Sequence, residues 1–84
     1  MKAIIVTHPT QNFKACLFGL DYDKLCLLAE LRAKLKGTIK SRFKTIEYSN
    51  EIELAKKVDS KVVGMYKITL EQYKHEINTH FEIN

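Results

Sequence analysis

Proline and glycine are scarce in this sequence, which has one proline and three glycines among 84 residues. That composition leaves little material for flexible linkers, and we find no internal repeat or low-complexity tract. A hydrophobic content of 45% with 29% charged residues is typical of a globular chain. We therefore expect a single small domain spanning residues 1–84. Its core is small, because a chain of this length buries only roughly 60–65% of its unfolded surface.

Cysteine is also rare, with Cys16 and Cys26 as the two thiols. Two cysteines are too few for a disulfide scaffold, and their spacing matches no zinc-binding motif. Cys16 lies in the apolar run ACLF, where a thiol is expected to be buried and inert. The pattern predicts two unpaired thiols in a reducing compartment.

Long apolar runs are absent. No stretch of the sequence approaches the ~20 apolar residues that a membrane-spanning helix needs. The run Ala3 to Val6 is too short for the core of a signal peptide, and no small-residue cleavage site follows it. We expect a soluble, intracellular protein, cytoplasmic in location, with no membrane partner.

Histidines and nucleophiles form no catalytic or metal-binding pattern. His75 and His80 in HEINTH are five residues apart, which turns them about 140° from each other on an ideal helix, whereas a zinc pair needs a spacing of four. His8 follows the first expected strand, but no nucleophile or fixed carboxylate accompanies it. The sequence therefore predicts no metal, no cofactor and no enzymatic activity.

Hydrophobic periodicity predicts an α+β domain with the order β-β-α-β-α-β-α. The expected strands are 2–7, 12–20, 38–48 and 62–68, although 12–20 also fits a helix. The expected helices are 21–37, 50–58 and 69–81, with Asn50 and Thr69 placed to cap the last two. We expect a mostly antiparallel sheet of about four strands with the helices packed on one face.

Two stripes run along the first expected helix. The apolar stripe expected to face the core contains Leu27, Leu28, Leu31 and Leu35. A second strip of small residues contains Cys26, Ala29 and Ala33. Small residues allow another surface to approach closely, so this strip is a candidate homodimer contact. Alternatively, the alanines are simply good helix formers at exposed sites.

Positive charge is concentrated in one part of the chain. The window between Glu30 and Glu47 carries six cations and no acid, so the rest of the chain carries −2 of the total +4. Such a local field attracts anionic partners. Two structural explanations compete with binding: cations are favoured at a helix C-terminus, and lysine on an edge strand prevents aggregation.

In the strand 38–48, the side chains of Lys40, Arg42 and Lys44 share one face. Ile46 and Tyr48 continue in step with these cations, so the expected apolar face changes sides after Thr45. A β-bulge or a change of environment would explain that change.

These patterns predict a small non-enzymatic regulatory protein of the inhibitor type that docks on an acidic surface of a larger macromolecule. The predicted partner-binding residues are Arg32, Lys34, Lys36, Lys40, Arg42, Lys44 and Tyr48. The alternative is a nucleic-acid-binding module. In its ribonuclease version, His8, Arg42 and Tyr48 would act on phosphate by positioning and electrostatic stabilisation.

Overall fold

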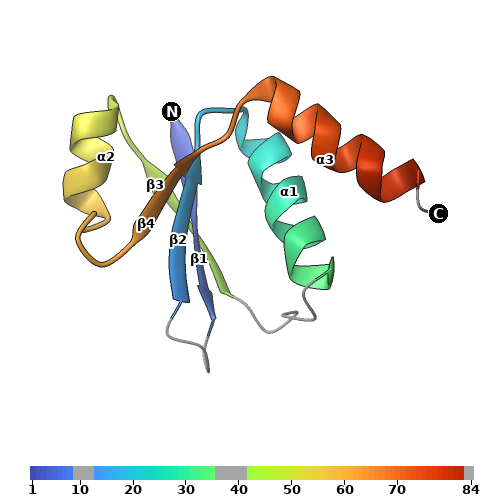
Figure 1. The fold of residues 1–84 in the computed structure, drawn as a ribbon. Helices are drawn as coiled ribbons and strands as arrows, with labels where there is room; N and C mark the ends of the chain where they lie inside the picture. Colours follow the sequence, from blue (N-terminus) through green and yellow to red (C-terminus); the bar gives the residue numbers. More distant parts are fainter. Residues whose placement is uncertain (9–12, 36–41, 83–84) are drawn as a thin grey trace.

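A computed structural model describes residues 1–8, 13–35 and 42–82. The described residues form four strands and three helices in the predicted order (Figure 1). The strands are β1 (Lys2–His8), β2 (Phe13–Phe18), β3 (Arg42–Glu47) and β4 (Gly64–Lys67). The helices are α1 (Tyr22–Leu35), α2 (Glu51–Lys57) and α3 (Leu70–Glu82). The α+β class is confirmed, and residues 13–18 form a strand.

The four strands make one mixed sheet in the order β3-β1-β2-β4. β1 is antiparallel to both β2 and β3, whereas β2 and β4 run parallel. Two of the three pairings are therefore antiparallel, as predicted. The two edges of the sheet, within the described residues, are β3 and β4.

The prediction that all helices pack on one face of the sheet is wrong. Ala3 and Cys16 point to the face that packs against Leu54 of α2, which we call the α2 face. Ile4 and Leu17 point to the opposite face, which packs against α1 and which we call the α1 face. Figure 1 shows α2 on one side of the sheet and α1 on the other. The central strands β1 and β2 are apolar at successive positions because both of their faces are covered.

The helix α1 is rotated relative to its predicted orientation. Its buried residues are Leu25, Leu28, Ala29 and Ala33. Of the predicted leucine stripe, Leu27 and Leu35 are 46% and 63% exposed. Of the strip of Cys26, Ala29 and Ala33, the two alanines are buried and Cys26 is half-buried, and Ala29 and Cys26 pack in the same cluster as Ile4 and Leu17. Most of the strip is therefore covered within the chain, which does not favour it as a homodimer contact.

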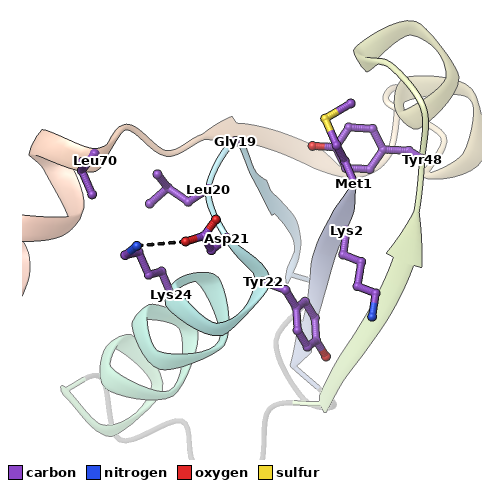
Figure 2. A pocket seen from close by; sticks show the side chains of 9 residues that line it. All are labelled: Met1, Lys2, Gly19, Leu20, Asp21, Tyr22, Lys24, Tyr48 and Leu70. Atoms are coloured by element: carbon purple, nitrogen blue, oxygen red, sulfur yellow. Dashed lines mark hydrogen bonds and ion pairs between the residues drawn. The ribbon is translucent and has the colours of Figure 1, made fainter.

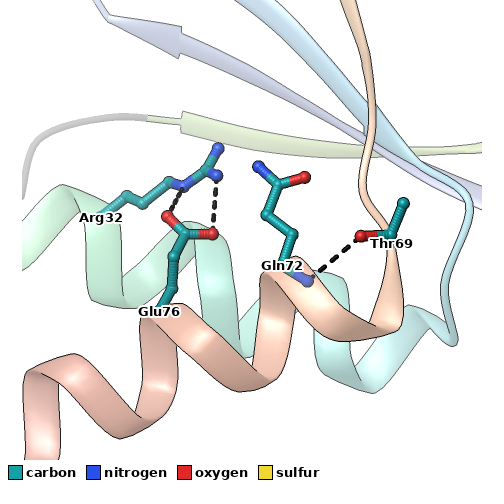
Figure 3. A network of polar contacts seen from close by, with 4 residues as sticks. All are labelled: Arg32, Thr69, Gln72 and Glu76. Atoms are coloured by element: carbon teal, nitrogen blue, oxygen red, sulfur yellow. Dashed lines mark hydrogen bonds and ion pairs between the residues drawn. The ribbon is translucent and has the colours of Figure 1, made fainter.

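Side-chain caps begin the helices α2 and α3 as predicted. Asn50 Oδ1 accepts a hydrogen bond from the backbone N–H of Glu53 at 2.9 Å. Thr69 Oγ1 accepts one from the backbone N–H of Gln72 at 3.1 Å (Figure 3). In α2, Leu54 and the C-cap Val58 are buried, whereas Ile52 is 72% exposed.

The helix α3 packs at the edge of the core. Tyr73 packs against the α1-face cluster and Ile77 is half-buried, whereas Leu70 is 44% exposed. The Phe81 side chain lies outside the described residues. Arg32 of α1 holds Glu76 of α3 through two hydrogen bonds of 3.1 and 2.9 Å (Figure 3). This bidentate pair joins the two helices.

Candidate binding surface on the sheet

The strand β3 keeps a regular register along its whole described length. Its pairing with β1 runs without interruption from Lys2↔Glu47 to Thr7↔Arg42, so the expected bulge is absent. The apolar face of this strand changes sides after Thr45 because the environment changes there. Ile46 and Tyr48 lie on the α2 face where Leu54 and Val58 cover it, and Arg42 and Lys44 continue that face beyond the helix.

Lys14 of β2 joins Arg42 and Lys44 on this face. Thr7 of β1 pairs with Lys14 on one side and with Arg42 on the other, so the three side chains form one row across three strands. In the next row, Ile5 pairs with Lys44 and with Cys16. We call the three exposed cations Lys14, Arg42 and Lys44, with Thr7 between them, the cationic sheet face. Lys14 was not predicted as part of this surface, because it lies far from β3 along the chain.

The cationic sheet face is open and its charges are unneutralised within the described part of the chain. Lys14, Arg42 and Lys44 are all exposed. In Figure 1, α2 lies over one end of its face of the sheet and leaves the other end uncovered by any described helix. The acids of α2 are already engaged, since Glu51 pairs with Lys67 and Glu53 with Lys57. Lys57 also holds the pKa of the Glu53 carboxyl below its usual range through their hydrogen bond.

Among the described residues, the other predicted partner-binding residues do not join this surface. Tyr48 is 7% exposed, and its ring packs edge-on against Phe18 with the centroids 6.4 Å apart. Burial raises the pKa of its hydroxyl, so Tyr48 is a core residue. Arg32 is half-buried in its pair with Glu76. Lys34 lies on α1, across the sheet from Arg42 and Lys44. Lys36 and Lys40 lie outside the described residues.

The histidines form no site among the described residues. No group of three or more His, Cys, Asp or Glu side chains in that part of the chain could hold a metal ion. His75 is exposed on α3, and His80 is half-buried one and a half turns later. The backbone of His8 ends β1, while its side chain lies outside the described set. The backbone of Tyr48 pairs with Met1, so the backbones of His8 and Tyr48 lie at opposite ends of β1.

Cys16 is expected to be unreactive in the folded protein. It is 0% exposed, and burial raises the pKa of its thiol, because an apolar environment disfavours the thiolate that reacts. In a Cys26→Ser variant, which keeps Cys16 as its one thiol, we expect no labelling by a thiol reagent until denaturant is added. Rapid labelling under native conditions would show that the α2 face opens at β2.

A hollow of about 520 Å³ lies at the other end of the sheet, between the start of β1 and the start of α1 (Figure 2). It is lined by Met1, Lys2, Gly19, Leu20, Asp21, Tyr22, Lys24, Tyr48 and Leu70. Its cations already have partners: Lys24 Nζ lies 2.9 Å from Asp21 Oδ2, and Lys2 Nζ lies 5.4 Å from the centre of the Tyr22 ring. The hollow thus offers less uncompensated charge than the cationic sheet face.

Comparison of the chain with protein-family models, with curated proteins and with solved structures finds no match. Among the described residues, no helix is both long enough and apolar enough to cross a membrane. Any functional conclusion therefore comes from the surface chemistry of the chain itself.

Proposed function

We propose that the protein is a non-enzymatic, inhibitor-type regulatory protein of the cytoplasm that binds an acidic surface of another protein through the cationic sheet face. The observation that carries this proposal is the row of Lys14, Thr7 and Arg42, with Lys44 beside it. These three cations are exposed on one face and make no ion pair with the described residues.

Two features of this surface favour a binding role over a merely solvated one. First, the cations come from two strands that are not neighbours, so edge protection of β3 explains Arg42 and Lys44 but not Lys14, since β2 lies inside the sheet. Second, half-buried apolar side chains adjoin them. Ile5 lies beside Lys44, and Met65 pairs with Cys16 in the same row. In such a surface the cations attract an acidic partner, and the apolar patch supplies area that the partner can bury.

The chemistry of this face fits an acidic protein better than a single-stranded nucleic acid. Proteins that bind single strands stack the bases on exposed aromatic rings beside their cations. The exposed aromatics of the described sheet are Phe43 and Tyr66, and the register places both on the α1 face. The aromatics of the α2 face, Phe18 and Tyr48, are buried. Nothing described on the cationic sheet face can stack a base.

Charge reversal on this face tests the proposal against a matched control. The test variant is Arg42→Glu with Lys44→Glu. The control is Lys34→Glu with Lys74→Glu, which changes two exposed lysines of α1 and α3. Each pair of substitutions lowers the formal net charge by four, from +4 to 0. The measurement is affinity for poly-glutamate, and for a mixed pool of single- and double-stranded oligonucleotides, over a range of salt concentrations.

We expect the unmodified protein to prefer poly-glutamate and to bind it more weakly as salt increases. The test variant should lose at least tenfold in affinity, whereas the control should lose about threefold or less. Equal losses in the two variants would mean that only net charge matters and would overturn the proposal. Tighter binding to oligonucleotides at about 150 mM salt, with a log–log slope near −3, would assign the surface to nucleic acid instead.

A further inference from the structure

The strand β3 is an open edge of the sheet beside the cationic sheet face. β1 pairs with its inner side, and no described strand pairs with its outer side. Four of its six residues are exposed in an unbroken run, Arg42 to Thr45. An open edge of this kind is a template for another strand.

The register identifies the backbone groups that point outward. The Tyr48 N–H donates to the Met1 carbonyl at 2.9 Å, so Tyr48 and Met1 form a hydrogen-bonded pair. Hydrogen-bonded pairs alternate along an antiparallel ladder. Arg42, Lys44 and Ile46 are therefore bonded to β1, whereas Phe43, Thr45 and Glu47 direct their N–H and C=O groups away from it.

Contacts at Glu47 agree with this assignment. Its carbonyl oxygen, which the register directs outward, accepts a hydrogen bond from Lys57 Nζ at 2.8 Å. Phe43 and Thr45 have no backbone hydrogen bond of this kind with the described residues. The free part of the edge is thus centred on Phe43, which lies between the two cations of β3, and on Thr45, which follows Lys44.

We propose that an extended acidic segment of the partner protein adds to the sheet as a strand alongside β3. This inference rests on the proposed function and specifies how the partner binds. Main-chain hydrogen bonds to Phe43 and Thr45 supply affinity in this mode, and alternate side chains supply specificity. Acidic side chains of the added strand lie on the α2 face opposite Arg42 and Lys44, where opposite charges on neighbouring strands are stabilising.

The other face of the added strand requires apolar residues. The Phe43 side chain points to the α1 face and is 41% exposed, so an apolar neighbour on an added strand would cover it. The partner segment therefore alternates acidic and apolar residues. Charge also argues against a second copy of this chain as the occupant, because pairing β3 with β3 brings the cations of two chains together without adding complementary acids.

Substitution at Thr45 separates strand addition from surface docking. In Thr45→Pro the outward N–H is removed, but no bond to β1 is lost, and proline is tolerated on an edge strand when its N–H side faces solvent. Because Thr45 also hydrogen-bonds to the Tyr22 hydroxyl through its side chain, the matched control is Thr45→Val. The control loses the same hydroxyl and keeps the N–H.

The probe is a synthetic heptapeptide that alternates glutamate and valine, and its isomer with the glutamates grouped together is the composition control. We expect the alternating peptide to bind at least tenfold more tightly than its isomer. Thr45→Pro should weaken that binding at least tenfold, while Thr45→Val stays within about twofold of the unmodified protein. Circular dichroism and thermal melting verify that both variants fold.

Three other outcomes each overturn the inference. If Thr45→Pro folds and binds normally while Arg42→Glu with Lys44→Glu does not bind, the partner docks on the face without adding a strand, and the proposed function survives. If none of these variants changes binding, the inference and the proposed function both fail. If the unmodified protein is a dimer in the absence of peptide and the Thr45→Pro variant is a monomer, the edge belongs to a second copy of the chain.

Discussion

Replacing Leu25 by alanine is expected to destabilise the fold by about 3 kcal/mol, since truncating a fully buried leucine costs about 2.7–5 kcal/mol. Leu25 is 0% exposed and packs with Leu28, Ile4 and Leu17 where α1 meets the sheet. A domain of this length has a free energy of unfolding of only about 4–13 kcal/mol, at about 0.05–0.15 kcal/mol per residue. The measurement is urea unfolding followed by circular dichroism.

The matched control is Leu27→Ala. Leu27 is 46% exposed, so its truncation removes little buried area, and we expect a loss of less than about 1 kcal/mol. This pair of variants also tests the orientation of α1. The leucine periodicity predicts that Leu27→Ala loses more stability than Leu25→Ala, which is the opposite of what the structure predicts. A larger loss for Leu27→Ala than for Leu25→Ala would show that the helix packs through the leucine stripe.

Gly19→Ala is expected to destabilise the fold by about 2 kcal/mol or more, because a non-glycine residue at positive φ costs about 1–2 kcal/mol before any steric contact. Gly19 has a φ of +102° at the turn between β2 and α1. A Cβ atom there would lie 3.0 Å from the Ile68 carbonyl oxygen. The Ile68 backbone cannot easily move away from this Cβ, because the Ile68 N–H donates a hydrogen bond to the Phe18 carbonyl at 2.8 Å.

Gly64→Ala is the control for this effect. A Cβ at Gly64 would lie 3.0 Å from atoms of the Tyr66 side chain, which is 52% exposed and can move aside. We expect this variant to lose less than about 1 kcal/mol. Unfolding curves for the two variants that coincide within error would contradict the role assigned to the Gly19 turn.

The sequence predicts the element order well because the caps and the periodicities are local. Asn50 and Thr69 identify the starts of two helices through hydrogen bonds that span three residues. The contiguous apolar residues of β1 correctly indicate a strand covered on both faces. The side of the sheet on which each helix packs depends on contacts between distant segments, and local periodicity does not contain that information.

The buried side of α1 could not be predicted from hydrophobic periodicity either. Its leucines and its small residues form two overlapping stripes, and hydrophobicity alone favours the leucines. In the structure, Ala29 and Ala33 are buried, and Ala29 packs in the same cluster as the sheet residues Ile4 and Leu17. Leu27 and Leu35 remain exposed. The buried side of α1 therefore combines leucines with small residues, and a hydrophobicity scale ranks the alanines below the exposed leucines.

The candidate site was predicted in part. The alternation of Arg42 and Lys44 on one strand face follows from the period of a strand and is present in the structure. Lys14 was missed because it joins them only through the pairing of β1 with both neighbours. Tyr48 follows the same alternation, but α2 folds back over it, so its side chain is buried.

The most direct test of the account is a map of backbone amide chemical shifts, recorded by NMR while the alternating glutamate–valine peptide is added. We predict that the largest changes occur at Phe43 and Thr45, with smaller ones at Lys44, Thr7 and Lys14. The outward N–H groups of Phe43 and Thr45 should also become protected from hydrogen exchange. Changes confined to the hollow around Tyr22 and Leu70, or to α3, would contradict the assignment of the cationic sheet face as the binding surface.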